Sequence, residues 1–521
     1  MQRAAVLLAV TLALGMLAPG CLDASNTSSS AARPTGPLKI TFSVLNASDP
    51  KEPIAFAQIT LLADHGPLLA VATDEKGNAP ISVPADATGF EVFAQGYLPS
   101  RGDLDRAPKT IIVRLKPVTD VTQIGESFGL RFRPAIDLGS KAYAVAAGTS
   151  CQDAAQDRDG NCGLGEPSVE VDSKGTIYVS GVCCIGNAPP VYVSRDDGKT
   201  FQVLSTPGVR EAFGIEGDFA IDDAGVIYFA DIELAASFQV TAWDATGRYL
   251  RHMKWPAPPL VDRDWIRAEG NGKLYYVYNT GSSTNVYTSQ DGGATWTPRP
   301  AYTANFGLGG AVKGTKPGEL WLLSPGAADG TRRAVYTLDG GTTWKAEPTK
   351  SPAAGMANGA FDEAGNLYSS GGRQDRVYAT LRTTDGVWHD PVMVSPNFGH
   401  HRMPWVAGGG PGKAAMAWYG TLDEKTDAKW YLFVAVSLDA DQPDAHWQVA
   451  VADPEPVVVG TLGRQLLDFL QVEIGPDGAI HVAYSKLRPT ADNGEEVLHY
   501  VHSEPTLPLQ MTKYFNGPKA A

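Results

Sequence analysis

The chain has 521 residues, of which 43% are apolar, and this is enough for roughly two or three domains with buried cores. Its formal charge is −14, from 57 acidic against 43 basic side chains, and no block of lysine or arginine stands out, so nucleic acid is excluded as an expected partner. The 56 glycines and 37 prolines favour an all-β protein with many turns.

The N-terminal residues have the pattern of an export signal. An apolar run over 4–17 is too short to span a bilayer and predicts a signal peptide over 1–20. The run ends in "LAPGC", and a Ser/Thr-rich tether over 21–36 follows. These residues resemble a lipoprotein signal, which implies that Cys21 carries the lipid, although the preceding leucine stands four residues before the cysteine instead of the usual three. We therefore expect an exported protein held at the cell surface only by this lipid anchor, with plain secretion or an uncleaved anchor as alternatives.

Residues 37–117 alternate apolar and polar side chains in short runs, which turn signals such as Lys76-Gly77-Asn78 interrupt. This pattern predicts a small β-sandwich. The arrangement "PIAFAQITLL…VATDEKGNAPISVP…FEVFAQGYLP" resembles the carboxypeptidase-regulatory-like, transthyretin-like domain. The resemblance implies a spacer or an adhesive module and no catalysis.

The next segment, 118–150, is expected to be a connector, and a strand within 129–147 is a candidate for closing the last sheet of the main body. Four further cysteines follow, an even number that favours two disulfides in an oxidising compartment. A bond between adjacent cysteines is strained, so we expect bonds from the first two cysteines to the last two, with the pairing left open. The four are Cys151, Cys162, Cys183 and Cys184.

A repeated pattern begins near residue 165, in which a few apolar residues precede a turn and a glycine, and an apolar-aromatic strand follows. Most copies are spaced about 47 residues apart, which suits a four-stranded propeller blade. We therefore expect 151–521 to form a seven-bladed β-propeller, with six blades as the alternative. The repeat glycines are Gly175, Gly225, Gly272, Gly318, Gly365, Gly412 and Gly478.

Three short boxes, "SRDDGKTF", "SQDGGATW" and "TLDGGTTW", recur in this region. The pattern resembles the Asp box of the sialidase-like, BNR-repeat propellers. Its aspartate can accept hydrogen bonds from turn amides, its glycine can take a positive φ, and its aromatic residue can fill space between sheets. Strand counting places the boxes opposite the face where propeller ligands usually bind, so their expected role is structural. The residues are Ser194, Asp196, Gly198, Ser289, Asp291, Gly293, Trp296, Thr337, Asp339, Gly341 and Trp344.

The resemblance to sialidases implies three arginines that grip a substrate carboxylate, a tyrosine nucleophile polarised by a glutamate, and an aspartate acid/base. The sequence departs from that family because its first repeat opens with "GEPSVEVD" and lacks the Phe/Tyr-Arg-Ile-Pro motif; the nearest string, "RFRPAI", lies too far upstream. The competing interpretation is that these side chains form ion pairs or pack inside the fold. The catalytic candidates are Asp218, Asp264, Arg263, Arg402, Arg464 and Tyr484.

One metal signal occurs in "DRDGN", where Asp157, Asp159 and Asn161 resemble the start of an EF-hand calcium loop. The later bidentate glutamate is missing, so a calcium ion is one interpretation and an Asx-rich turn between the flanking cysteines is the other. We expect no required cofactor otherwise.

Taken together, these patterns favour recognition of an extracellular glycan or protein without chemistry, at the face where the inner strands begin. The alternative is a sialidase-type exo-glycoside hydrolase, and a structural role is the third candidate. Fold alone does not decide among them.

Overall fold

The structure is a computed structural model, and it is all β in the residues that it describes. No helix that could cross a membrane occurs in the described ranges. All five cysteines, Arg464 and the candidate calcium loop lie outside them. The described residues are 38–54, 57–63, 66–74, 76–85, 87–94, 97, 100–104, 108–117, 130, 132–138, 165–182, 190–206, 217–233, 237–256, 262–280, 283–300, 310–323, 332–352, 358–396, 399–421, 429–462, 466, 468–488 and 495–504.

The first seven strands form two sheets that share one hydrophobic cluster. In β1, alternate side chains are buried, namely Ile40, Phe42 and Val44, so one face of the strand packs into this core. The sheets have the orders β4-β1-β7 and β3-β2-β5-β6. The strands are β1 (Leu38–Asn46), β2 (Gln58–Ala63), β3 (Gly66–Ala72), β4 (Asn78–Val83), β5 (Gly89–Phe93), β6 (Ser100–Asp103) and β7 (Thr110–Leu115).

Seven four-stranded antiparallel sheets make up the rest of the described chain. The first three contain β9 (Gly165–Val171), β10 (Ile177–Val182), β11 (Tyr192–Ser194), β12 (Gln202–Val203); β13 (Asp218–Ile221), β14 (Ile227–Glu233), β15 (Ser237–Trp243), β16 (Tyr249–Pro256); and β17 (Asp262–Glu269), β18 (Lys273–Asn279), β19 (Thr284–Ser289), β20 (Thr297–Pro298). The next three contain β21 (Ala311–Lys313), β22 (Leu320–Leu323), β23 (Arg333–Thr337), β24 (Lys345–Pro348); β25 (Gly359–Phe361), β26 (Leu367–Arg373), β27 (Arg376–Arg382), β28 (Val392–Met393); and β29 (His401–Gly408), β30 (Ala414–Gly420), β31 (Lys429–Ser437), β32 (Gln448–Val459). The last contains β33 (Gln471–Ile474), β34 (Ile480–Arg488), β35 (Glu495–His502) and β8 (Ile136–Asp137).

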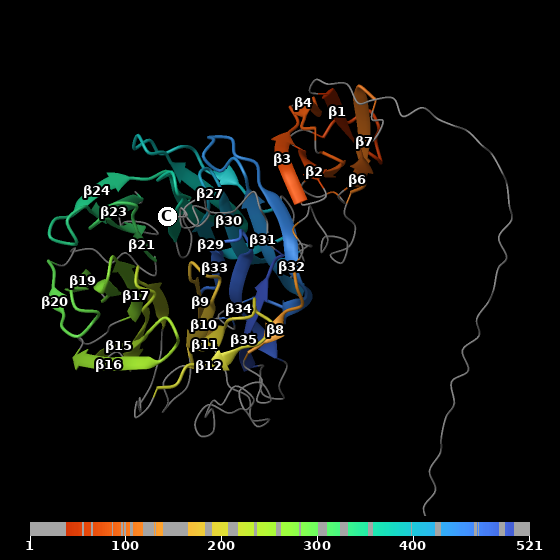
Figure 1. Cartoon of the computed structure of the whole chain (residues 1–521). Coiled ribbons are helices and arrows are strands. Elements are labelled where there is room, and N and C mark those ends of the chain that lie inside the picture. Colours follow the sequence, from red (N-terminus) through yellow and green to blue (C-terminus); the bar gives the residue numbers. More distant parts are fainter. Residues whose placement is uncertain are drawn as a thin grey trace, which may run out of the picture.

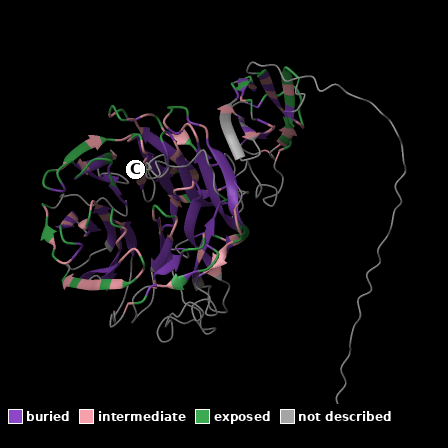
Figure 2. Ribbon diagram, in the orientation of Figure 1, coloured by how far each residue is buried: buried purple, intermediate pink, exposed green. Residues whose placement is uncertain are grey.

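The seven sheets are arranged in a ring (Figure 1). The first strand of each sheet contacts the first strand of the next, and β33 contacts β9, which closes the circle. The strands near the centre are buried, whereas the outer strands β16, β20 and β24 are largely half-buried or exposed (Figure 2). We call the side of the ring on which these first strands begin the entry side.

The last sheet is completed by a strand that precedes the whole ring in the sequence. β8 pairs antiparallel with β35, with Tyr500 opposite Ile136. Next to it, Arg133 forms ion pairs with Glu504 and with Asp197 on the neighbouring sheet. Residues from both ends of the described ring are therefore joined in one sheet.

Two tiers of hydrogen bonds connect five of the inner strands to the next sheet. The first tier uses polar side chains seven residues before the repeat glycines, which reach backbone groups of the following sheet. These bonds satisfy buried polar groups and also hold adjacent sheets in register. Val169 N donates to Gln471 Oε1 (3.1 Å), and Ser168 Oγ donates to Gly217 O. Ile266 N donates to Asp218 Oδ2 (3.0 Å), and Val406 N donates to Asn358 Oδ1 (3.1 Å).

The second tier uses three carboxylates, Asp222, Glu269 and Asp362, which stand three residues before repeat glycines. Each accepts a hydrogen bond from the amide of the next repeat glycine, and each also accepts one from a tyrosine hydroxyl in its own sheet. Glycine is thus favoured at this position for two reasons. It adopts a positive φ without strain, and its backbone amide can come close to the neighbouring sheet. The amide bonds are Gly272 N to Asp222 (2.9 Å), Gly318 N to Glu269 (2.9 Å) and Gly412 N to Asp362 (2.7 Å).

Each Asp box lies in the turn between the third and fourth strands of its sheet. In the third box, Asp339 accepts hydrogen bonds from Thr337 Oγ1 (2.8 Å), Thr343 N (2.8 Å) and Thr343 Oγ1 (2.6 Å). The Thr343 hydroxyl is the main reason that the pKa of Asp339 is lowered to about 2. The box turn also touches the repeat-glycine turn, since Gly340 N donates to Gly318 O (2.9 Å). The boxes are therefore on the side of the ring opposite the entry side.

Replacing Asp339 by Ala should lower the free energy of unfolding by about 1–2 kcal/mol, because several turn hydrogen bonds are lost while their donors stay open to water. The folded-state pKa lies below the ordinary value of 3.8, so this contribution is present above about pH 4 and is lost as the pH falls through about 2. Urea unfolding at pH 7 and pH 2.5 measures it. Asp390→Ala, at an exposed pair with Lys350, is the control and should change little. Equal effects of the two variants would contradict a structural role for the box.

Candidate functional site

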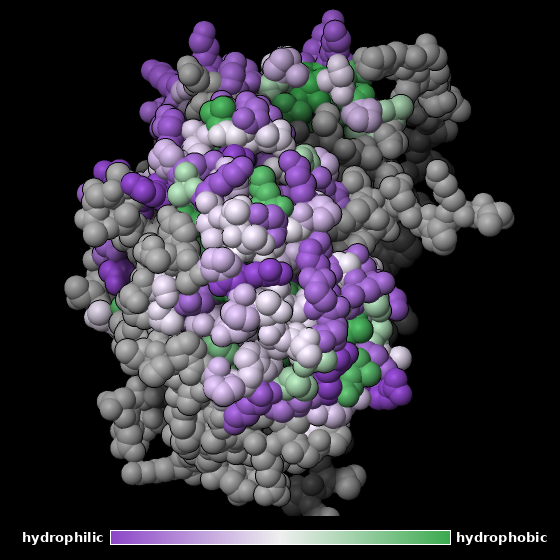
Figure 3. Space-filling view, turned by 90° about the vertical axis from the view of Figure 1, so that its left-hand side faces the viewer, coloured by the Kyte–Doolittle hydropathy of each residue, from purple (hydrophilic) through white to green (hydrophobic). Residues whose placement is uncertain are grey.

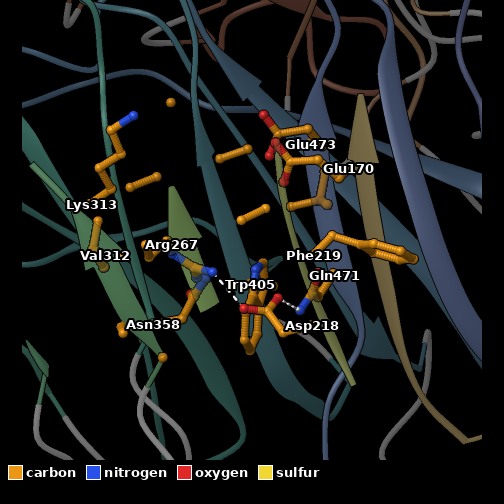
Figure 4. Close-up of a pocket in the computed structure, with 18 of the residues that line it drawn as sticks. Glu170, Asp218, Phe219, Arg267, Val312, Lys313, Asn358, Trp405, Gln471 and Glu473 are labelled. Carbon is orange, nitrogen blue, oxygen red and sulfur yellow. Dashed lines mark hydrogen bonds and ion pairs between the residues drawn. The ribbon is translucent and has the colours of Figure 1, made fainter. Parts of the chain in front are cut away.

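A cavity of about 290 Å³ lies at the centre of the ring. First strands of all seven sheets contribute to its lining, as do residues that directly precede some of them (Figure 4). This cavity is where polar side chains of distant parts of the sequence converge, and we take it as the candidate functional site.

The middle of the cavity wall is formed by the residues five positions before each repeat glycine, which we call the channel ring. Two of its members are acidic and lie on the adjacent strands β33 and β9, and two are basic and lie on the adjacent strands β17 and β21. The other three are alanines. In order around the ring the residues are Glu473, Glu170, Ala220, Arg267, Lys313, Ala360 and Ala407.

Below the channel ring, towards the entry side, Asp218 organises a polar cluster. Its carboxylate forms an ion pair with Arg267 and accepts a hydrogen bond from Gln471 Nε2 at 3.5 Å. Asp218 is only 3% exposed, and its further bond to a backbone amide of β17 compensates the cost of burial. The carboxylate therefore has a clear structural function in addition to lining the cavity.

The two acidic members of the channel ring lie side by side in Figure 4. Burial is the largest cause that raises the pKa of Glu170 well above its ordinary value, and the neighbouring Glu473 carboxylate raises it further. Arg267 and Lys313 act in the opposite direction. The pair is consequently able to hold a proton at a higher pH than an ordinary carboxylate does.

The catalytic candidate Arg263 lies in a buried ion cluster near the entry side. Its guanidinium is bonded to both carboxylate oxygens of Glu166 and also to Asp468, and it lies 5.2 Å from the centre of the Phe469 ring. Arg263 is 2% exposed. Both Arg263 and Glu166 have a positive φ, of 60° and 42°, so the backbone is strained to bring these two side chains together.

Asp264 follows in the same strand, and its carboxylate accepts a hydrogen bond from the Tyr276 hydroxyl. Burial raises the pKa of Asp264 to about 7, with Asp218 adding to the effect and Arg263 opposing it. A carboxyl with this pKa can exchange a proton near neutral pH. However, Asp264 is 2% exposed, so access to a substrate would require movement.

Tyr484 lies in the middle of β34 and is fully buried. Its hydroxyl donates to Asp453 on β32, which also forms an ion pair with Lys486 at 2.6 Å. Burial and Asp453 raise the pKa of Tyr484 well above its ordinary value, so the phenol stays protonated. The structure thus places this tyrosine in a polar cluster between strands and not at the cavity.

Arg402 is at the beginning of β29, on the entry side, and its side chain is 48% exposed. It pairs with Asp375 at 3.0 Å, and His400 contacts the other oxygen of the same carboxylate at 3.2 Å. The guanidinium lies 5.8 Å from the centre of the Trp430 ring. This exposed group of charged and aromatic side chains is a surface feature suited to ligand contact.

Of the catalytic candidates with a described position, Asp218 lines the cavity, whereas Arg263, Asp264, Tyr484 and Arg402 contact other groups. Among the described residues, no hydrogen bond or ion pair joins Arg263, Arg402 and Tyr484 to one another. Sequence reasoning did not single out the charged residues of the channel ring. Their common position before the repeat glycine is the signal that would have found them.

The described surface carries few large exposed apolar side chains, and they are scattered over several strands and turns. Figure 3 shows polar and apolar residues interspersed on one face. No group of three His, Cys, Asp or Glu side chains within the described ranges is placed to hold a metal ion.

Four-stranded antiparallel sheets around a central channel define the chain as a β-propeller. No family model and no curated protein matches the sequence. Similar solved structures include an intramolecular trans-sialidase from Ruminococcus gnavus (14% identity, TM-score 0.38, covering 72% of this chain and 99% of that one). They also include the NanB sialidase from Streptococcus pneumoniae (12% identity, TM-score 0.38, covering 87% of this chain and 92% of that one). Another is virginiamycin B lyase from Staphylococcus aureus (11% identity, TM-score 0.41, covering 71% of this chain and 99% of that one).

Proposed function

We propose that this chain is an exported, lipid-anchored surface protein whose seven-bladed propeller binds an extracellular glycan or protein at the entry side, without chemistry. Residues 37–117 act as a sandwich-like spacer between the anchor at Cys21 and the propeller. The observation that carries the proposal is that Arg263 and Tyr484, the residue types a sialidase would need, are engaged by internal carboxylates, while Arg402 remains exposed beside an aromatic ring.

Binding of the purified full chain to glycan and extracellular-protein arrays tests this proposal, and the two arrays separate the two ligand classes. Arg402→Ala should weaken binding by about tenfold, because it removes an exposed cation and its contact with Trp430. The matched control is Arg248→Ala, an exposed arginine of the β15–β16 turn on the opposite side, which should bind like the unaltered chain. Failure to bind on both arrays, or an equal loss in both variants, would refute the proposal.

The alternative is a sialidase-type hydrolase, and the raised pKa of Asp264, about 7, is the observation in its favour. A panel of fluorogenic glycosides separates the alternatives. Our proposal expects no turnover above the background rate. Turnover that is abolished by Asp264→Asn in a folded variant would instead favour the hydrolase.

A further inference from the structure

We propose that the central channel binds a small zwitterion, with its ammonium at Glu170 and Glu473 and its carboxylate at Lys313 and Arg267 (Figure 4). The inference goes beyond the proposed function, because it concerns a small molecule inside the channel and not a glycan or protein at the entry side.

The first support is the separation of charge around the channel ring. The acidic pair comes from neighbouring strands, and so does the basic pair. One alanine separates the pairs in one direction and two alanines in the other, so opposite charges face each other across the cavity. Such an arrangement complements a molecule with a positive end and a negative end, and it disfavours a ligand with a single charge.

The second support is that two of these side chains, Lys313 and Glu170, do not join the sheets. Polar residues in the tiers above and below bind the neighbouring sheet, as Asp218 and Asp222 do. By contrast, Lys313 makes no ion pair and the Glu170 side chain makes no hydrogen bond with the described residues. Arg267 uses Nη1 for its bonds to Asp218 and a backbone oxygen, and a guanidinium has further donors.

The third support is the space at this level. The volume of about 290 Å³ is near the lower end for small-molecule sites, roughly 300–1,000 Å³. Lys313 is exposed, and Glu170, Arg267 and Glu473 are half-buried, so solvent reaches all four charged members of the channel ring. Within the channel ring, the three alanines leave the positions between the charged pairs free of long side chains.

The acidic pair adds a measurable property. Burial, Glu473 and Asp218 raise the pKa of Glu170, while Arg267 and Lys313 lower it. An ammonium group beside the pair favours the ionised form, so binding should release a proton. Affinity should therefore increase as the pH rises, until Glu170 is ionised in the free protein.

Titration calorimetry of the full chain with β-alanine, γ-aminobutyrate and ε-aminocaproate tests the proposal, because the series varies the distance between the two charges. One member should bind, with heat that depends on the buffer's ionisation enthalpy. Its N-acetyl and amide derivatives should bind at least about tenfold more weakly, since each lacks one charge. These ligand changes test the site without altering the fold.

Lys313→Met and Glu473→Gln should each weaken binding of that ligand about tenfold or more. Lys345→Met on the outer strand β24 and Asp223→Asn in an exposed turn are the matched controls and should not change affinity. Absence of zwitterion binding, or equal affinity in Lys313→Met, would overturn the inference. If the arrays still reveal a ligand in that case, the proposed function stands, whereas failure of both assays removes both proposals.

Discussion

Arg263→Met should lower the free energy of unfolding by about 3–5 kcal/mol, because it leaves one buried and one half-buried carboxylate without their cation. Glu166 is 4% exposed and is bonded through both oxygens to Arg263, and Asp468 contacts the same guanidinium. The backbone at position 263 has a φ of 60°, which is strained. In the methionine variant, the ion pairs that offset this strain energy are missing. Urea and thermal unfolding monitored by tryptophan fluorescence measure the loss.

A matched comparison distinguishes a structural role from a general effect of removing an arginine. Arg248→Met removes a guanidinium that is 75% exposed and should cost less than about 1 kcal/mol. The triple variant Glu166→Gln, Arg263→Met, Asp468→Asn should recover part of the stability, since no unpaired charge then remains. If Arg263→Met is as stable as the unaltered chain, the ion cluster does not stabilise the ring.

Acid should destabilise the ring through its last sheet. His481 is buried between Tyr500 and His502, and burial lowers its pKa to about 3, with His502 and Arg133 lowering it further. The unfolded chain binds a proton at this histidine below about pH 6.5, whereas the folded chain does not until about pH 3. Stability is therefore retained above about pH 6.5 and decreases by about 1.4 kcal/mol per pH unit between these values for this residue alone.

The test is the dependence of unfolding free energy on pH between 7 and 4. His481→Gln keeps a neutral hydrogen-bonding side chain beside Tyr500 and should reduce the slope by about one proton. Burial also lowers the pKa of His502, so part of the slope should remain in the variant. The control is His252→Gln on the outer strand β16, where the ring is partly exposed. Identical slopes in His481→Gln and the unaltered chain would contradict the explanation.

Sequence patterns were sufficient for the all-β propeller class because its repeats depend on local chemistry. A glycine with positive φ, such as Gly272, and an Asp box around Asp291 each form their turns with nearby residues. Such local constraints are visible in a single sequence. The count of seven blades and the sandwich-like spacer are parts of the proposed function.

The partners of the charged residues were not predictable in the same way. Arg263 and Glu166 are 97 residues apart, and Tyr484 on β34 meets Asp453 on β32, a strand of the neighbouring sheet. These contacts depend on strand register and on how sheets are placed around the ring, which spacing in the sequence does not reveal. The channel ring was overlooked because its charges alternate with apolar residues that resemble an ordinary buried strand.

The closing strand β8 has a consequence for how the protein is made. Arg133, next to β8, and its partner Glu504 are 371 residues apart along the chain. During synthesis the first six sheets can pair locally, but the seventh has no complete set of strands until β35 has emerged. Until that moment the edge of β34 that pairs with β35 stays uncovered, and so does the face of β9 that packs against the last sheet. The open ring is therefore the species most exposed to aggregation and to chaperones.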